Sequence, residues 1–211
     1  MNIRQLSVAA LTLSLCGCAT SSVKQISKSP TYQGGPVQKV AVIAVDERGL
    51  VRQGFENRFL HVFRAHGQEA VVTHDLLGLP EIKADKEAAA ARVREAGADS
   101  VLIIRLVDQT TYSRQVRATP ERYAATATGF GDNYGWYDCY SVAFMDMSTV
   151  WGSTTQKIYL DTTLFDLKTG QRLWSALTLT VLKENKDRLA EADSLVAKVV
   201  SALCKDGMVR Q

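Results

Sequence analysis

The sequence predicts an α/β fold with a mixed sheet, and two observations lead to this prediction. Between residues 37 and 108, three short segments rich in β-branched residues alternate with two amphipathic segments at helical spacing. This order is typical of right-handed crossovers and of a sheet with a parallel core. After residue 138, three strand candidates follow one another without helices between them, and a helix closes the chain. That order is typical of a β-meander followed by a helix.

In the first half of the chain, the strand candidates are residues 37–45, 69–74 and 100–108. The first is an almost uninterrupted apolar run, as expected of a strand buried on both faces. Residues 76–82 contain a glycine and a proline, so we expect a loop there.

Two helices are predicted between these strands. The first spans residues 50–66 and ends before Gly67. Its apolar stripe consists of Phe55, Phe59, Val62, Phe63 and His66. The second spans residues 86–96, is rich in alanine and has Asp85 as its candidate N-cap.

The second half begins with an irregular, glycine-containing and aromatic insertion at residues 119–138. The strand candidates after it are residues 139–151, 155–167 and 171–181, and the closing helix spans residues 186–204. Short turn sequences separate the three strands. The predicted folded unit is therefore one domain, residues 37–206.

Composition and charge argue against a nucleic-acid partner and against an integral membrane protein. The 211 residues carry 25 basic and 22 acidic side chains, a net charge of +3. No long basic run is available to follow a phosphate backbone, so nucleic acid is not an expected partner. No apolar stretch reaches the roughly 20 residues of a spanning helix, so an integral membrane protein is not expected.

The first seventeen residues are predicted to be a signal peptide, because a short basic start precedes about ten apolar residues. The sequence that follows, Leu15-Cys16-Gly17-Cys18-Ala19, resembles a bacterial lipobox. By this resemblance Cys18 carries a thioether-linked diacylglycerol and an amide-linked acyl chain, which together anchor a protein stably. Cys16 does not fit as the lipidated residue, because Leu15 is too bulky for the position that precedes the cysteine of a lipobox. An ordinary secretory signal with incidental cysteines is the alternative.

The anchor predicts where the domain is held. Residues 18–36 are rich in Ser, Lys, Gln, Gly and Pro, so we expect a flexible tether. By sorting rules like those of enterobacteria, Ala19 in place of Asp implies the periplasmic face of the outer membrane. No cofactor is expected apart from the lipid on Cys18.

Two cysteines remain after cleavage and lipidation, Cys139 and Cys204. A disulfide between them would close a loop of about 65 residues and stabilise the fold by roughly 4 kcal/mol. Two separate buried thiols are the alternative. The chain has no Cys-x-x-Cys pair and no Cys/His cluster, so we expect no metal site.

Ligands of open α/β sheets bind beyond the carboxyl ends of the parallel strands. Asp46 and Asp75 follow two of the predicted strands, His74 ends the second, and Asp108 ends the third. These side chains are candidates for acid–base work or for a divalent metal. Alternatively, the aspartates bond turn amides, and Asp108 lies within a longer strand.

A second candidate site is the aromatic part of the insertion. Phe130, Tyr134, Trp136, Tyr137 and Tyr140 occur within eleven residues, among glycine, aspartate and asparagine. Rigid amphipathic rings on an adaptable backbone are typical of interfaces with proteins or sugars. The alternative is a lid whose aromatic rings pack on the protein's own sheet.

Three segments carry a resemblance to a known superfamily. These are the tether with the strand Lys39–Val45, the Gly97-Ala98-Asp99 turn that enters a strand, and residues 164–175, with the pattern Asp-x-x-Thr-Gly-x-x-x-Trp. Together they resemble bacterial envelope lipoproteins with a TolB N-terminal-domain-like fold, such as the curli secretion lipoprotein CsgG and the penicillin-binding-protein activator LpoB. The long insertion departs from that pattern, and no pore-forming element is recognisable.

The resemblance implies a non-catalytic lipoprotein that binds, recruits or regulates an envelope partner. This partner would be a secretion or assembly component, a cell-wall enzyme or another cell-wall component. One alternative is an envelope hydrolase or metal-dependent enzyme that uses the acidic strand ends. Another is a ring-forming structural subunit, since relatives of this fold form homo-oligomers.

Overall fold

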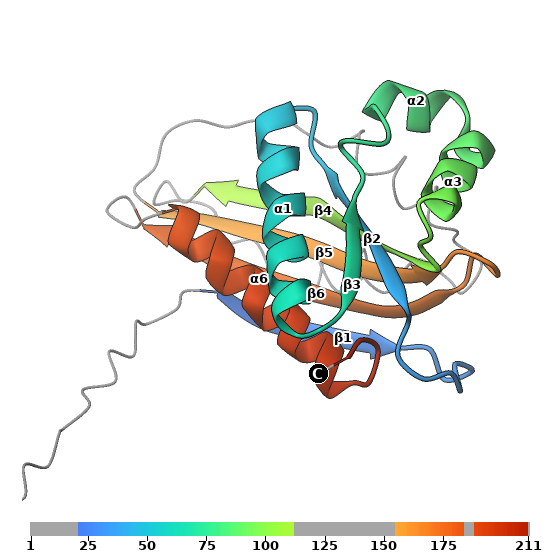
Figure 1. Cartoon of the computed structure of the whole chain (residues 1–211). Coiled ribbons are helices and arrows are strands. Elements are labelled where there is room, and N and C mark those ends of the chain that lie inside the picture. The colour runs from blue at the N-terminus through green and yellow to red at the C-terminus, as the bar shows by residue number, and fades with distance from the viewer. Residues whose placement is uncertain (1–20, 112–154, 184–187, 211) are drawn as a thin grey trace, which may run out of the picture.

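The computed structural model describes residues 21–111, 155–183 and 188–210. This part of the chain is an α/β structure built on a six-stranded mixed sheet of order β1-β6-β5-β4-β2-β3 (Figure 1). β3, β2 and β4 are parallel neighbours, whereas β4, β5, β6 and β1 pair antiparallel. The predicted α/β class, with a mixed sheet and a parallel core, is confirmed for these residues.

The bounds of most elements lie close to those predicted. The strands are β1 (Ser21–Lys28), β2 (Lys39–Val45), β3 (Glu69–Val72), β4 (Ser100–Thr111), β5 (Thr155–Asp166) and β6 (Arg172–Lys183). The helices are α1 (Gly49–Ala65), α2 (Leu79–Ala84), α3 (Lys86–Glu95) and α6 (Arg188–Lys205). Asp85 caps α3 as expected, since its carboxylate accepts a hydrogen bond from the Ala88 amide at 2.9 Å.

The sheet separates two apolar cores. α1 and α6 lie side by side on one face (Figure 1), where Val40, Leu102, Trp174 and Val200 are fully buried. α2 and α3 cover the other face near β2 and β4. β2 serves both cores, because its alternate residues point to opposite faces. This is why the segment reads as a continuous apolar run.

α1 packs most of the predicted apolar stripe on the core, because Phe55 and Val62 are partly buried against the same cluster as Phe59 and Phe63. Its buried residues are Arg52, Glu56, Phe59 and Phe63. His66 is exposed at the C-cap, where its amide bonds the last turn. The predicted stripe is therefore confirmed except at His66, but it left out the buried pair Arg52 and Glu56 in the row of Phe59 and Phe63.

Both turn motifs singled out in the sequence are stabilised by an aspartate. The carboxylate of Asp99 accepts hydrogen bonds from the Gln38 and Lys39 amides at 2.8 and 3.0 Å, which holds the entry to β2. The carboxylate of Asp166 accepts bonds from the Lys168 and Thr169 amides, which closes the β5–β6 hairpin. The motifs are structural turns.

The flexible tether expected over residues 18–36 is wrong for Ser21–Lys28, which form β1. This strand pairs antiparallel with β6 along its length, with a bulge between Val23 and Gln25. The Ser21 and Thr180 hydroxyls lie 2.9 Å apart. The segment reads as polar because β1 is an edge strand, in which every residue after Ser21 stays partly or largely exposed.

Two smaller corrections concern the first half. Part of the loop expected at residues 76–82 is helical, since Pro80 lies in the first turn of α2, where its missing amide proton is tolerated. Asp108 is not a strand end, because β4 runs on to Thr111 and places Asp108 opposite Tyr159.

Several predicted features lie outside the described residues. They are the signal peptide, Cys18, Cys139, the strand at residues 139–151, the insertion at residues 119–138 and its aromatic residues Phe130, Tyr134, Trp136, Tyr137 and Tyr140. Within the described ranges, no helix is long and apolar enough to cross a membrane.

We expect β1 to protect its lysines from trypsin. The Lys24–Gln25 bond in the folded chain should be cleaved at least about a hundredfold more slowly than in a synthetic peptide of residues 21–28, because cleavage requires β1 to detach. Val23→Asp should speed the cleavage, since Val23 packs against the core. Equal cleavage rates in the folded chain and in the peptide would contradict the pairing of β1 and favour a flexible tether.

Candidate functional site

The ends of β2 and β3 meet a polar centre built around Glu56 of α1. The Glu56 side chain is completely buried. One carboxylate oxygen accepts hydrogen bonds from the Ala44 amide at 3.1 Å and from the Arg52 Nε at 2.8 Å. The other accepts from the Thr73 and His74 amides at 2.9 and 2.7 Å. One helical carboxylate thus joins β2 to the segment that follows β3.

Arg52 balances this buried charge. It lies one turn before Glu56 and its side chain is only 6% exposed. Its two terminal nitrogens donate to the Leu77 carbonyl at 2.9 Å and to the Thr73 hydroxyl at 3.0 Å. Every nitrogen of the guanidinium therefore has a partner, which is the condition under which a buried ion pair is tolerated.

His74 is the predicted site residue that joins this centre. Its Nδ1 lies 2.8 Å from Glu56 Oε2, and its Nε2 lies 3.3 Å from Asp75 Oδ1. A carboxylate can only accept, so the Nδ1 proton is donated to Glu56 and the ring is held in one orientation. The His74 side chain is 11% exposed, whereas that of Asp75 is 72% exposed. Asp75 therefore extends into solvent.

Asp46 does not complete a cluster with these two residues. Its carboxylate instead binds Arg48 in a bidentate manner, at 2.9 and 2.7 Å, and also accepts the Arg48 amide. The hydrogen bond to Asp46 raises the pKa of the Arg48 guanidinium. Across the described ranges, no group of three or more His, Cys, Asp or Glu side chains could hold a metal ion.

Glu56, Arg52 and Thr73 are not among the site residues expected from the sequence. A signal was present, because Arg52 and Glu56 are four residues apart and continue the helical row of Phe59 and Phe63. An oppositely charged pair within an otherwise apolar stripe indicates a buried pair.

A second buried ion pair lies within the sheet. Arg105 of β4 and Asp161 of β5 are paired at 2.8 Å, and both side chains are 5% exposed. They face each other directly across the β4–β5 register. The Thr163 hydroxyl lies 3.3 Å from Asp161. This pair ties the parallel half of the sheet to the antiparallel half.

Cys204 is a buried thiol in α6. Its Sγ donates a hydrogen bond to the Arg210 carbonyl at 3.1 Å, and burial raises the pKa of the thiol. Whether Cys204 pairs with Cys139 stays a prediction with its two alternatives. Cys139 lies outside the described residues.

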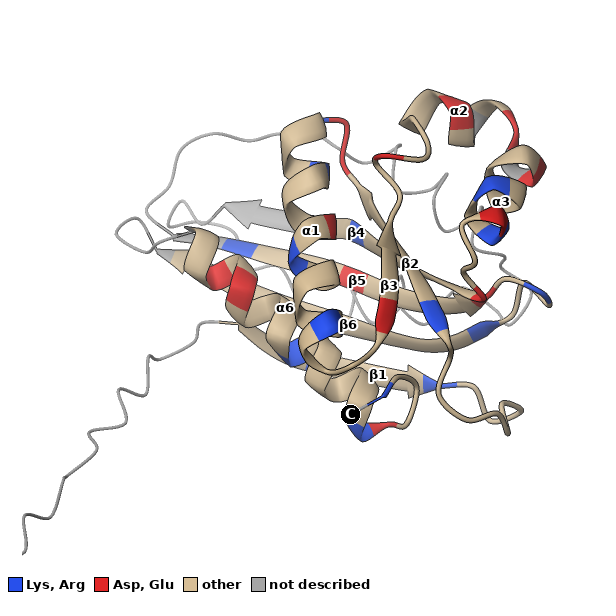
Figure 2. Ribbon diagram, in the orientation of Figure 1, with Lys and Arg blue, Asp and Glu red and all other residues tan. Residues whose placement is uncertain are grey.

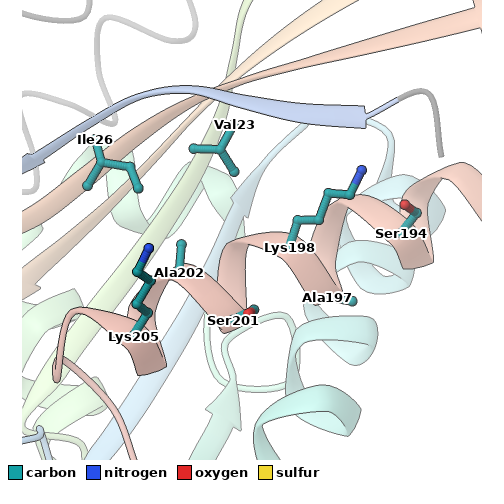
Figure 3. Close-up of a pocket in the computed structure, with 8 residues that line it drawn as sticks. All are labelled: Val23, Ile26, Ser194, Ala197, Lys198, Ser201, Ala202 and Lys205. Atoms are coloured by element: carbon teal, nitrogen blue, oxygen red, sulfur yellow. The ribbon is translucent and has the colours of Figure 1, made fainter.

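Several hollows border α6 in the described part of the chain. A cavity of about 410 Å³ lies among α1, α6, β5 and β6; it is lined mainly by apolar side chains and also by Glu191, whose Oε2 is buried without a hydrogen bond. A groove of about 470 Å³ runs between α6 and β1 (Figure 3). The groove is lined by Val23, Ile26, Ser194, Ala197, Lys198, Ser201, Ala202 and Lys205.

By its fold, the described part of the chain is an α/β protein with a six-stranded mixed sheet. No family model matches the chain, and no curated protein matches it significantly.

Two solved structures are similar to this chain at low sequence identity. A PelC dodecamer from Paraburkholderia phytofirmans is 17% identical over 90% of this chain and 99% of that chain, with a TM-score of 0.49. Lipoprotein GNA1162 from Neisseria meningitidis is 14% identical over 79% of this chain and 98% of that chain, with a TM-score of 0.39. At these identities and TM-scores, neither likeness assigns a family, a function or an assembly to this chain.

Glu56→Gln should destabilise the fold by about 3–5 kcal/mol, because it leaves Arg52 as an uncompensated buried charge. The free energy of unfolding from urea titration measures this loss. Glu95→Gln, on the exposed end of α3, is the matched control and should change stability by less than about 0.5 kcal/mol. Equal effects of the two substitutions would contradict the role given to Glu56.

Proposed function

We propose that this chain is a lipid-anchored, non-catalytic protein of the bacterial envelope that binds an envelope partner. The observation that carries the proposal is the Leu15–Ala19 sequence, in which a small residue precedes Cys18 directly after an apolar signal core. Three acyl chains on one cysteine would hold the protein stably on a bilayer. Ala19 implies the periplasmic face of the outer membrane.

The position of β1 leaves only a short segment between the proposed lipid attachment site and the sheet. β1 begins at Ser21, three residues after Cys18. Three residues span at most about 10 Å. A lipid on Cys18 would therefore hold the sheet against the bilayer, rather than let the domain search the space around it.

The hydrogen bonding at the strand ends supports a non-catalytic role. Both oxygens of Glu56 and all three nitrogens of Arg52 bond groups within the protein. The Asp46 carboxylate accepts hydrogen bonds from the Arg48 guanidinium and from the Arg48 backbone amide. Polar groups used in this way stabilise the loops after β2 and β3. The alternative is an enzyme that uses His74, because a carboxylate on Nδ1 is also how a catalytic histidine is oriented.

The class of partner follows from the sequence resemblance. The TolB-like turn motifs and the aromatic residues at 129–140 suggest a secretion or assembly component, a cell-wall enzyme or another cell-wall component. A third candidate function, after partner binding and catalysis, is that of a ring-forming structural subunit. Light scattering of the purified chain would detect such an oligomer.

Cys18→Ser should release the chain from the membrane fraction, because it removes the lipid attachment atom. Cys16→Ser is the matched control and should leave the chain in the membrane fraction. Fractionation and the mass of the N-terminal peptide measure the two effects. A membrane-bound Cys18→Ser chain, or an unmodified Cys18 peptide, would contradict the proposal.

A photoreactive residue in place of Trp136 should give a discrete protein adduct in living cells, identified by mass spectrometry. The reason is that the aromatic residues around it have the composition of an interface. A folded and lipidated chain that gives no adduct would instead make this segment a structural lid.

A further inference from the structure

We infer that the groove between β1 and α6 is a membrane-docking surface that binds the anionic headgroups of the bilayer to which the chain is anchored. The inference rests on the proposed lipid at Cys18 and goes beyond it, since it assigns one face of the domain to the lipid surface. The occupant is a bilayer with anionic phospholipid.

The groove combines an apolar floor with a basic rim. Val23 and Ile26 approach it from β1, while Lys198 and Lys205 extend from α6 toward β1 (Figure 3). Small side chains of α6 lie between the two lysines. Long lysine stems over an apolar floor, with the ammonium groups at the rim, are typical of side chains at a membrane interface.

The positive charge of this surface is not neutralised locally. The lining includes no acidic side chain among the described residues. Lys198 donates to the Ser21 carbonyl and Lys28 to the Asp206 carbonyl, so both bond backbone oxygens. Lys24 adds a further exposed charge on β1.

The C-terminal half of α6 carries lysines and no acidic residue (Figure 2). Glu191 and Asp193 lie in its N-terminal half, and Lys198 and Lys205 lie in its C-terminal half. The carboxylate of Asp206 just beyond the helix accepts the Trp174 Nε1 proton at 2.7 Å. The groove therefore presents cations to a partner, which fits anionic headgroups.

Ile26 supplies an apolar contact within this basic surface. Its side chain is 45% exposed, and it is one of three large hydrophobic side chains exposed in the described ranges. It pairs with Ala176 and so points to the α6 side of the sheet. An exposed aliphatic side chain among lysines is typical of surfaces that bury an apolar contact at the headgroup boundary.

The anchor brings this surface to the bilayer. Ser21 lies three residues after Cys18, and Lys198 holds its carbonyl. The groove thus begins within about 10 Å of the lipid attachment point, comparable to the Debye length of about 8 Å at physiological salt. The bulge and exposed lysines of β1 also discourage pairing with another strand, which argues against a second copy as the occupant.

The test uses the full chain, expressed with its own leader, purified with its lipid and reconstituted into phosphatidylcholine vesicles with or without phosphatidylglycerol. Benzoylphenylalanine replaces Ile26 or, in a matched chain, Leu50, which is 85% exposed at the start of α1. With phosphatidylglycerol present, irradiation should give at least about fivefold more phospholipid adduct from position 26 than from position 50.

Two further variants test the charge. Lys24→Gln with Lys205→Gln should lower the adduct yield at position 26 by about fivefold or more, since each lysine near an anionic surface contributes about that factor. Arg94→Gln with Lys168→Gln removes the same charge from exposed positions elsewhere and should leave the yield unchanged.

Equal adducts at positions 26 and 50, a yield independent of phosphatidylglycerol, or a protein adduct from position 26 would each overturn the inference. The mass of the N-terminal peptide separates this failure from that of the proposed function. A lipidated chain without the adduct overturns the docking surface alone, whereas an unmodified Cys18 overturns both.

Discussion

The buried carboxylate of Glu56 is the constraint on which the parallel half of this protein depends. It receives hydrogen bonds from β2, from the segment after β3 and from Arg52 in its own helix. A charge without solvent is tolerated only when all of these partners are in place. The position of α1 on the sheet, the end of β2 and the path of the chain after β3 are therefore interdependent.

Polar side chains elsewhere in the structure also serve the fold. Asp99 holds the entry to β2, Asp166 closes the β5–β6 hairpin, and Asp206 accepts the indole proton of the buried Trp174. These carboxylates already accept hydrogen bonds from within the protein. Surfaces beside the sheet are therefore better placed to bind a partner. The lysine-rimmed groove next to β1 is such a surface, and it lies closest to the anchor sequence.

The strand-end rule led to residues that lie beside the buried Glu56, but local spacing could not supply the contacts made there. His74 and Asp75 do follow a parallel strand, and the rule about strand ends led to them. Their partner Glu56 comes from a helix, eighteen residues before His74, and spacing along the chain does not give that distance in space. Likewise Asp46 is a turn residue because Arg48 folds back onto it. β1 was missed because an edge strand needs few apolar residues.

The sequence by itself determined the class of fold, the order of most elements and the lipobox-like motif, since hydrophobic periodicity, glycine stops and turn motifs are local properties. Only the tertiary structure decided that Ser21–Lys28 joins the sheet, that Arg52 and Glu56 are buried, and that Lys198 and Lys205 face Ile26 across a groove. Each of these depends on contacts between residues far apart in the chain. Burial and hydrogen-bond partners are set by packing, and no local pattern records which distant segment will cover a side chain.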